Sequence, residues 1–134
     1  MIGIRTGGVT IAEILHRNLK PDLPLGQLNI SFYRDDFSHI GMHPVVGASE
    51  LPFDVDDKTV ILVDDVLHSG RTIRAAMNEI FDYGRPEKII LATLVERSGR
   101  ELPISANVIG RSMDLPDNQQ VKLRSDMSLE IIKE

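Results

Sequence analysis

Two continuous apolar runs, with a helix pattern between them, form the middle of the chain. Residues 60–63 (Val-Ile-Leu-Val) and 89–95 (Ile-Ile-Leu-Ala-Thr-Leu-Val) are rich in β-branched side chains, which is typical of strands buried on both faces of a parallel sheet. The helix pattern ends near Gly84, which suits a left-handed residue after a helix, and Pro86 prevents continuation. Strand, helix and strand in this order predict a right-handed βαβ unit. The expected buried stripe of the helix recurs every three or four positions: Ile73, Ala76, Met77, Ile80 and Phe81.

Weaker patterns before this unit extend the same architecture. Residues 1–5 predict a strand that feeds a glycine-rich turn, and a helix from about residue 10 to residue 19 follows it. Residues 28–33 alternate apolar and polar side chains, as a strand near the edge of a sheet does. Residues 35–51 show no sustained period and predict a long loop, which in a compact domain is more often functional than accidental. The first helix is expected to bury Ile11, Ile14, Leu15 and Leu19.

Beyond residue 98 the pattern weakens. Residues 107–109 and 129–132 predict short strands, whose pairing the sequence leaves open. The whole pattern predicts an α/β fold, in which sites are expected at the carboxyl ends of the strands.

The composition fits one globular domain and excludes several other classes. A chain of 134 residues with 42% hydrophobic and 26% charged residues is long enough to bury a core. It contains no Cys, which excludes disulfide scaffolds, thiolate zinc sites and cysteine nucleophiles. No apolar run approaches the ~20 residues of a membrane helix, and the start lacks the apolar core of a signal peptide, so we expect a cytoplasmic protein. The net charge of −5 argues against general attraction to nucleic acid and leaves a local basic patch open.

The segment 60–72 carries the clearest chemical signal. A buried strand is expected to end in Asp64 and Asp65, and a short loop of small residues then opens the helix. Free backbone N–H groups and the helix dipole make such a helix start an anion site, which Gly70 lets the main chain approach closely. Two acids would repel a phosphate bound beside them. They fit the same site if the ligand joins a phosphate to a sugar, because carboxylates accept hydrogen bonds from the vicinal hydroxyls of the sugar. The side chains expected to add donors or charge are Ser69, Arg71 and Thr72.

Each half of this segment also has an ordinary structural explanation. Paired Asp residues after a strand are common in solvated loops, and Ser-Gly-x-Thr is a common helix cap. The adjacency of both halves after a fully apolar strand favours the ligand site. The spacing is neither that of a Walker loop nor that of a Rossmann fingerprint. The four His residues, at positions 16, 39, 43 and 68, lack a recognised zinc arrangement, so no His-based metal site is expected.

Residues 60–72 resemble the phosphoribosyl pyrophosphate (PRPP) motif of type I phosphoribosyltransferases. Together with other segments in matching order, they resemble the family of bifunctional pyrimidine operon attenuation regulators and uracil phosphoribosyltransferases over nearly the whole chain. This resemblance implies a central, mostly parallel sheet flanked by helices with a small hood, in a single domain of residues 1–134. The other segments are Ile2-Gly3-Ile4-Arg5-Thr6, Tyr33-Arg34-Asp35-Asp36, Tyr83-Gly84-Arg85-Pro86 and Arg100-Glu101-Leu102-Pro103-Ile104.

The resemblance implies the conversion of uracil and PRPP to uridine monophosphate (UMP) and pyrophosphate. Mg²⁺ is the implied cofactor, bound mainly through PRPP and not by protein ligands. Asp64 and Asp65 are the implied catalytic residues, which hold the ribose hydroxyls, and Arg5, Thr6 and Gly7 are the implied pyrophosphate loop. The implied PRPP- and phosphate-binding residues are Val66, Leu67, His68, Ser69, Gly70, Arg71 and Thr72.

Three further residues have implied roles, and each role has alternatives. Arg34 would start a flexible loop that closes over the site and excludes water, although beside Asp35 it also fits an ordinary turn ion pair. Arg97 would contact the nucleobase at the end of the second apolar strand. Val121 would contact the base or nucleotide, although plain core is the competing explanation. Arg5 likewise fits a simple pairing with a surface acid.

The sequence departs from the family pattern in three places. It begins almost inside the first strand, so we expect the family's N-terminal helical segment, and part of the cover of the site, to be missing. Gly7 stands where the family usually has Arg, which removes a cationic contact near pyrophosphate. Gly99 stands where the family usually has His, near the expected base pocket. Gly7 and the absent N-terminal segment favour one alternative, a nucleotide-sensing, RNA-binding regulator without turnover. A phosphoribosyltransferase for another base is a second alternative, against which the segment at residues 100–104 argues.

The resemblance also implies UMP-dependent binding to the messenger RNA leader of a pyrimidine operon, and a homodimer or higher homo-oligomer with no membrane partner. RNA binding requires a concentrated basic face, because the net charge is −5. An evenly mixed surface charge is the alternative, unless a dimer gathers the cations. The Lys and Arg residues are scattered: Arg17, Lys20, Arg71, Arg74, Arg85, Lys88, Arg97, Arg100, Arg111, Lys122 and Arg124.

Overall fold

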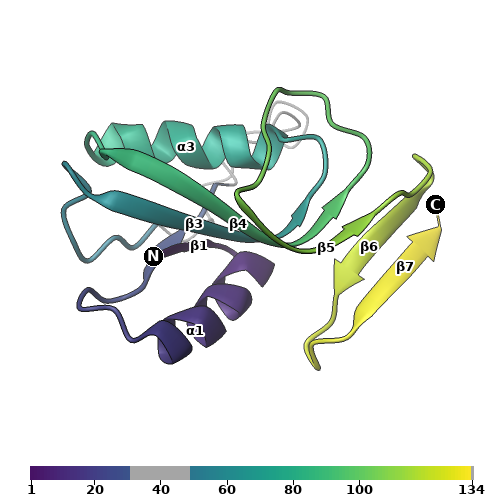
Figure 1. Cartoon of the computed structure of the whole chain (residues 1–134), viewed down its shortest axis with the longest axis horizontal. Helices are drawn as coiled ribbons and strands as arrows, with labels where there is room; N and C mark the ends of the chain where they lie inside the picture. The colour runs from purple at the N-terminus through teal and green to yellow at the C-terminus, as the bar shows by residue number, and fades with distance from the viewer. Residues whose placement is uncertain (31–48, 134) are drawn as a thin grey trace.

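A five-stranded parallel sheet with helices on both faces is the centre of the fold. The computed structural model describes residues 1–30 and 49–133. The strand order is β2-β1-β3-β4-β5, and every neighbouring pair is parallel. Figure 1 shows α1 (Gly7–Leu19) below the sheet and α3 (Arg71–Tyr83) above it, so the predicted α/β class is confirmed. The strands are β1 (Ile2–Ile4), β2 (Gly26–Leu28), β3 (Thr59–Leu67), β4 (Lys88–Arg97) and β5 (Val108–Met113).

The two apolar runs are the adjacent strands β3 and β4, as predicted, but β3 is longer than its apolar run. Its pairing with β4 continues past the acids to Leu67, which lies opposite Glu96 and is buried. The prediction that the strand ends at the acids is therefore wrong. Asp64 and Asp65 project from the strand itself, because the pairing keeps the chain extended beyond them. Only residues 68–70 remain as the connection to α3.

The helix α3 buries most of its predicted stripe. Ile73, Ala76 and Ile80 are buried, and Met77 packs against the same core. Phe81, however, is 56% exposed, so its assignment to the stripe is wrong. The buried face of α3 is therefore narrower than the sequence pattern predicts. Phe81 lies in the last turn of the helix, which ends at Tyr83.

The residue after α3 also differs from the prediction. Gly84 has φ of 165°, which is extended backbone and not the left-handed conformation expected there. A Cβ at this position would lie 2.5 Å from Oδ1 of Asp56 and 2.9 Å from Cγ2 of Val55. The position therefore requires Gly because another segment approaches closely, and not because of its φ angle.

The helix α1 starts earlier than predicted and buries a different set of residues. Ile11 and Ala12 are buried, and Leu15 packs against the same cluster. Ile14 is only half-buried and Leu19 is 63% exposed, so the prediction for Leu19 is wrong. Leu19 is the last helical residue, where the sheet no longer covers the helix.

The C-terminal residues form a second, two-stranded antiparallel sheet of β6 (Gln119–Leu123) and β7 (Leu129–Lys133). The predicted strands at 107–109 and 129–132 are present as β5 and β7. The sequence pattern did not indicate β6, in which polar side chains outnumber apolar ones. Figure 1 shows this pair beyond β5, and β6 contacts β3.

The edge strand β2 ends at Leu28, so it overlaps the edge strand predicted for residues 28–33 at one residue only, and residues 29 and 30 are not in a strand. Residues 31–48 lie outside the described residues. They include Arg34 and most of the predicted loop at 35–51. Among the residues that are described, no helix combines the length and apolar character needed to cross a membrane.

Candidate active site

A cavity of about 600 Å³ lies where three parts of the chain meet. The turn between β1 and α1 supplies Arg5, Thr6 and Gly7. The carboxyl end of β3 supplies Asp64 and Asp65, and residues 122–125 of β6 and the following turn form the opposite wall. The cavity thus lies at the carboxyl ends of neighbouring parallel strands, where the fold class predicts a site.

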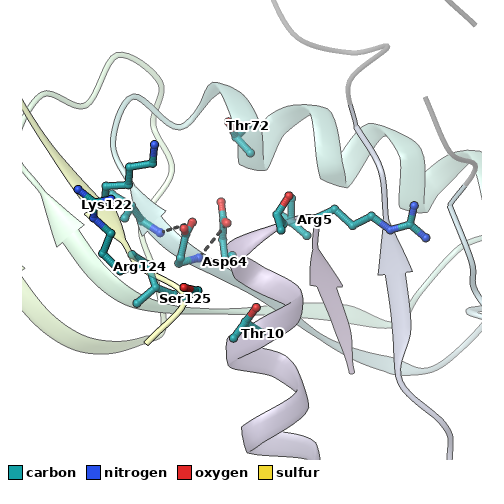
Figure 2. Close-up of a pocket in the computed structure, with 13 residues that line it drawn as sticks. Arg5, Thr10, Asp64, Thr72, Lys122, Arg124 and Ser125 are labelled. Carbon is teal, nitrogen blue, oxygen red and sulfur yellow. Dashed lines mark hydrogen bonds between the residues drawn. The ribbon is translucent and has the colours of Figure 1, made fainter. Parts of the chain in front are cut away.

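The acidic side chains of Asp64 and Asp65 line the cavity from β3. Asp64 is only 6% exposed, and its Oδ1 accepts a hydrogen bond from the backbone N–H of Asp65 at 2.8 Å. Asp65 is half-buried, and its Oδ1 accepts from the backbone N–H of Val66 at 2.9 Å. Figure 2 shows both bonds and places Asp64 between Thr72 and the wall that carries Lys122. These bonds hold one oxygen of each carboxylate against the main chain beside the cavity that both residues line.

The turn at Arg5, Thr6 and Gly7 lies directly against the acids. A Cβ at Gly7 would fall 2.1 Å from Oδ2 of Asp65, so a larger residue at this position would require a different placement of the Asp65 carboxylate. The side chain of Arg5 points away from the cavity in Figure 2. Its Nε donates to Oε1 of Gln27 at 3.1 Å, and its NH2 group lies 3.6 Å from Oε1 of Glu50. The alternative of a surface ion pair therefore describes the side chain of Arg5, while its main chain lines the cavity.

A smaller cavity of about 150 Å³ adjoins the first one at Val66 and Thr72, which line both. Gly70 has φ of +95°, a left-handed conformation that favours Gly and places it at the start of α3. Arg71 points its Nε to Oε1 of Glu101 at 3.0 Å. The structure thus brings the predicted phosphate-binding segment together around a helix N-terminus, with Arg71 as the one member that does not line this space. The lining residues are Val66, Leu67, His68, Ser69, Gly70, Thr72 and Ile73.

His68 is held against the segment that follows β4. A Cβ at Gly99 would lie 2.7 Å from Nε2 of His68, so the small residue at 99 makes room for the imidazole. The backbone carbonyl of His68 accepts a hydrogen bond from NH1 of Arg100 at 2.5 Å. Burial lowers the pKa of His68, and the positive charge of Arg97 lowers it further. The imidazole is therefore neutral at pH 7.

Arg97 and Val121 do not line the main cavity. Arg97 is 2% exposed, and its guanidinium donates to backbone carbonyls, among them that of Leu115 at 3.0 Å. It also borders a separate cavity of about 430 Å³ at the ends of β4 and β5. Val121 is buried in β6 opposite Ile131. The base contacts that were predicted for both residues stay predictions, since the geometry shows only their packing and hydrogen bonds.

The sequence reasoning missed several residues of the site. Lys122, Arg124 and Ser125 line the cavity from the C-terminal segment, and Thr10 does so from α1. Arg124 also pairs with Glu130 of β7. The alternation of Gln, Val, Lys and Leu at 120–123 is a weak strand signal, but nothing in it shows that the strand faces the carboxylates.

Comparisons with known proteins decide the family. The sequence profile of the phosphoribosyl transferase domain matches residues 1–122. The chain belongs to the phosphoribosyltransferase domain family. The family resemblance, the fold class and the prediction of a phosphoribosyl-transfer enzyme are therefore confirmed.

Relatives and solved structures agree with this assignment. The Bifunctional protein PyrR of Nitrosococcus oceani is 64% identical over 126 residues, which is 92% of this chain and 71% of that protein. The Bifunctional protein PyrR of Pseudomonas fluorescens is 52% identical over 97% of this chain and 77% of its own length. A purine phosphoribosyltransferase from Pyrococcus horikoshii has a similar fold, with a TM-score of 0.63 and 26% identity over 85% of this chain and 72% of that chain.

Proposed function

We propose that this chain is a uracil phosphoribosyltransferase that also regulates pyrimidine operon expression by UMP-dependent binding to a messenger RNA leader. The similarity to proteins named Bifunctional protein PyrR supports both activities. The observation that carries the enzymatic half is the convergence of three segments on two adjoining cavities: the Arg5–Gly7 turn and the two acids of β3 line the larger one, and the helix N-terminus at Gly70 lines the smaller one.

In this proposal each segment takes one part of the substrate. The backbone N–H groups around Gly70 hold the 5′-phosphate, while Asp64 and Asp65 accept hydrogen bonds from the ribose hydroxyls. In the reaction, N1 of uracil forms a bond with C1′ of the ribose and loses its proton. The bond from C1′ to the pyrophosphate oxygen breaks, and pyrophosphate leaves with the electron pair beside the turn at Thr6. Positive charge that develops at C1′ is stabilised by the nearby carboxylates, and positioning supplies the remaining rate enhancement.

Magnesium fits the residues that are present. Within the described part of the chain, no group of three or more His, Cys, Asp or Glu side chains is placed to hold a metal ion. Asp64 and Asp65 nevertheless put two oxygen-bearing groups beside the cavity, and Mg²⁺ prefers oxygen ligands and often takes most of them from substrate phosphates and water. When bound with PRPP, the ion would neutralise charge on the leaving pyrophosphate. Arg34 keeps its proposed role in a covering loop, outside the described residues.

The enzymatic proposal is tested by the PRPP- and Mg²⁺-dependent conversion of radiolabelled uracil to UMP. Asp65→Asn keeps the shape of the side chain and removes its charge, so turnover is expected to fall at least 100-fold while the melting temperature is retained. Hypoxanthine as the alternative acceptor separates a uracil enzyme from a phosphoribosyltransferase for another base. Binding of UMP without turnover of either base would support the sensor hypothesis and reject the enzymatic one.

The regulatory proposal is tested by a gel shift with a pyrimidine operon leader RNA, with and without UMP. Several of the scattered cations are already paired: Arg71 with Glu101, Arg100 with Glu96, and Arg124 with Glu130. A homodimer or higher homo-oligomer would bring exposed cations of two chains onto one surface, and light scattering measures the oligomeric state directly. No shift at low salt, where phosphate contacts are strongest, would reject the regulatory half alone.

A further inference from the structure

Hydrogen bonds from the end of β4 hold the segment that leads into β6. Arg97 is buried, and its NH2 group donates to the carbonyls of Leu115 at 3.0 Å and Pro116 at 3.4 Å. Its NH1 group donates to the carbonyl of Gln119, and its Nε to that of Ser98 at 2.8 Å. The hydroxyl of Ser98 adds two bonds, donating to the carbonyl of Leu115 at 3.0 Å and accepting from its N–H at 2.9 Å. The guanidinium, which has five N–H donors, thus donates to four backbone carbonyls.

What these bonds hold in place is one wall of the active-site cavity. Gln119 is the first residue of β6, and the wall residues Lys122 and Ser125 follow within six positions. In the described residues β6 pairs with β7 and with no strand of the main sheet. Its place relative to Asp64 is therefore set by side-chain packing and by the bonds from Arg97 and Ser98, and not by a backbone ladder.

The wall formed by β6 is the part of the cavity left for the base. The Gly70 segment takes the phosphate, the acids of β3 take the ribose, and the turn at Thr6 faces the pyrophosphate. We propose that Arg97 is a positioning residue for the nucleobase: it holds β6, through the carbonyls of residues 115–119, at the distance from C1′ that uracil needs. This inference rests on the proposed function, and it gives Arg97 a role without direct contact with the base.

The first test is steady-state kinetics of Arg97→Lys and Ser98→Ala. A lysine keeps the positive charge but has no planar fork, so it cannot hold the same set of carbonyls. The KM for uracil is expected to rise about tenfold in Arg97→Lys and less in Ser98→Ala, while the KM for PRPP stays within twofold of wild type, because misplacement of one reactant by ~1 Å is enough to cost up to 10²-fold. Arg111→Lys, at an exposed position of β5, is the matched control and leaves both KM values unchanged.

A double-mutant cycle separates action through β6 from direct contact. If Arg97 acts through the wall, the rises in the KM for uracil caused by Arg97→Lys and by Lys122→Ala are less than multiplicative when the two are combined. Fully multiplicative effects, or an equal rise in the KM for PRPP, would overturn the proposal, since a merely structural lesion affects both substrates.

Hydrogen–deuterium exchange tests the inference independently of turnover. In Arg97→Lys, amides in a peptide covering residues 117–125 are expected to exchange at least fivefold faster, while those of residues 60–67 keep their wild-type rates. If wild type converts no uracil but this exchange pattern appears, the proposed function fails and the control of the wall by Arg97 stands. Unchanged exchange at residues 117–125 overturns the inference whatever the activity.

Discussion

The contact between Gly7 and Asp65 gives the sharpest prediction for the reaction. The perturbation is Gly7→Ala, which adds one methyl group at the start of α1. The added carbon would lie 2.1 Å from Oδ2 of Asp65, whereas ordinary contact begins near 3.4 Å. The carboxylate must therefore move by about 1 Å or more, and it loses its 2.9 Å bond from the N–H of Val66.

The magnitude follows from the proposed role of this carboxylate beside the reacting ribose. A misplacement of about 1 Å costs ~10²-fold in rate, which corresponds to roughly 2.7 kcal/mol of transition-state stabilisation. Gly7 is the first residue of α1, where replacement of Gly by Ala changes stability by less than the ~1 kcal/mol typical of a helix interior. We therefore expect kcat/KM for uracil to fall about 100-fold while the melting temperature changes little.

The assay compares Gly7→Ala with Asn18→Ala, an exposed position on the same helix, in uracil conversion and in thermal unfolding. The same change is then made in an Asp65→Ala background, where the carboxylate is gone and Gly7→Ala is expected to have no further effect. The reasoning is refuted if Gly7→Ala keeps kcat/KM within twofold of wild type, or if its effect is just as large without the carboxylate.

Three further predictions concern the ionisable groups and the phosphate-binding turn. Burial lowers the pKa of His68, so below about pH 6.5 the unfolded chain binds more protons than the folded chain and stability falls as the pH drops. The loss of melting temperature from pH 7.5 to pH 5.5 is therefore expected to be smaller in His68→Gln than in wild type. An equal loss in both proteins would contradict this prediction. Burial raises the pKa of Glu79, so its charged form costs stability as the pH rises through that pKa; Glu79→Gln should raise the melting temperature at pH 7 more than at pH 4, as a pH series of thermal unfolding would show. Gly70→Ala places a side chain at φ of +95° and should destabilise the protein by about 1–2 kcal/mol and weaken binding of ribose 5-phosphate, which calorimetry measures; unchanged affinity would mean that the phosphate is held elsewhere.

The sequence was sufficient to predict the elements whose signal is local. The apolar runs predicted β3 and β4, the spacing at 73–80 predicted α3, and the segment of adjacent acids and small residues lines two adjoining cavities, while its role as a binding site stays a prediction. The side chains that surround this site from 122–125 were not predicted, because β6 carries mostly polar residues and its place depends on long-range bonds from Arg97. The same holds for Gly84, whose requirement comes from Asp56 and Val55 and not from its own turn.

In the proposed function β3 and α3 hold the phosphate and the ribose, while another wall of the cavity comes from a separate pair of strands near the C-terminus. Substitutions in that pair can alter which heterocycle is accepted without disturbing the anchoring of the sugar phosphate. A shared framework can in this way serve pyrimidine and purine acceptors alike, with the choice of base determined by the short C-terminal segment that contains β6 and β7.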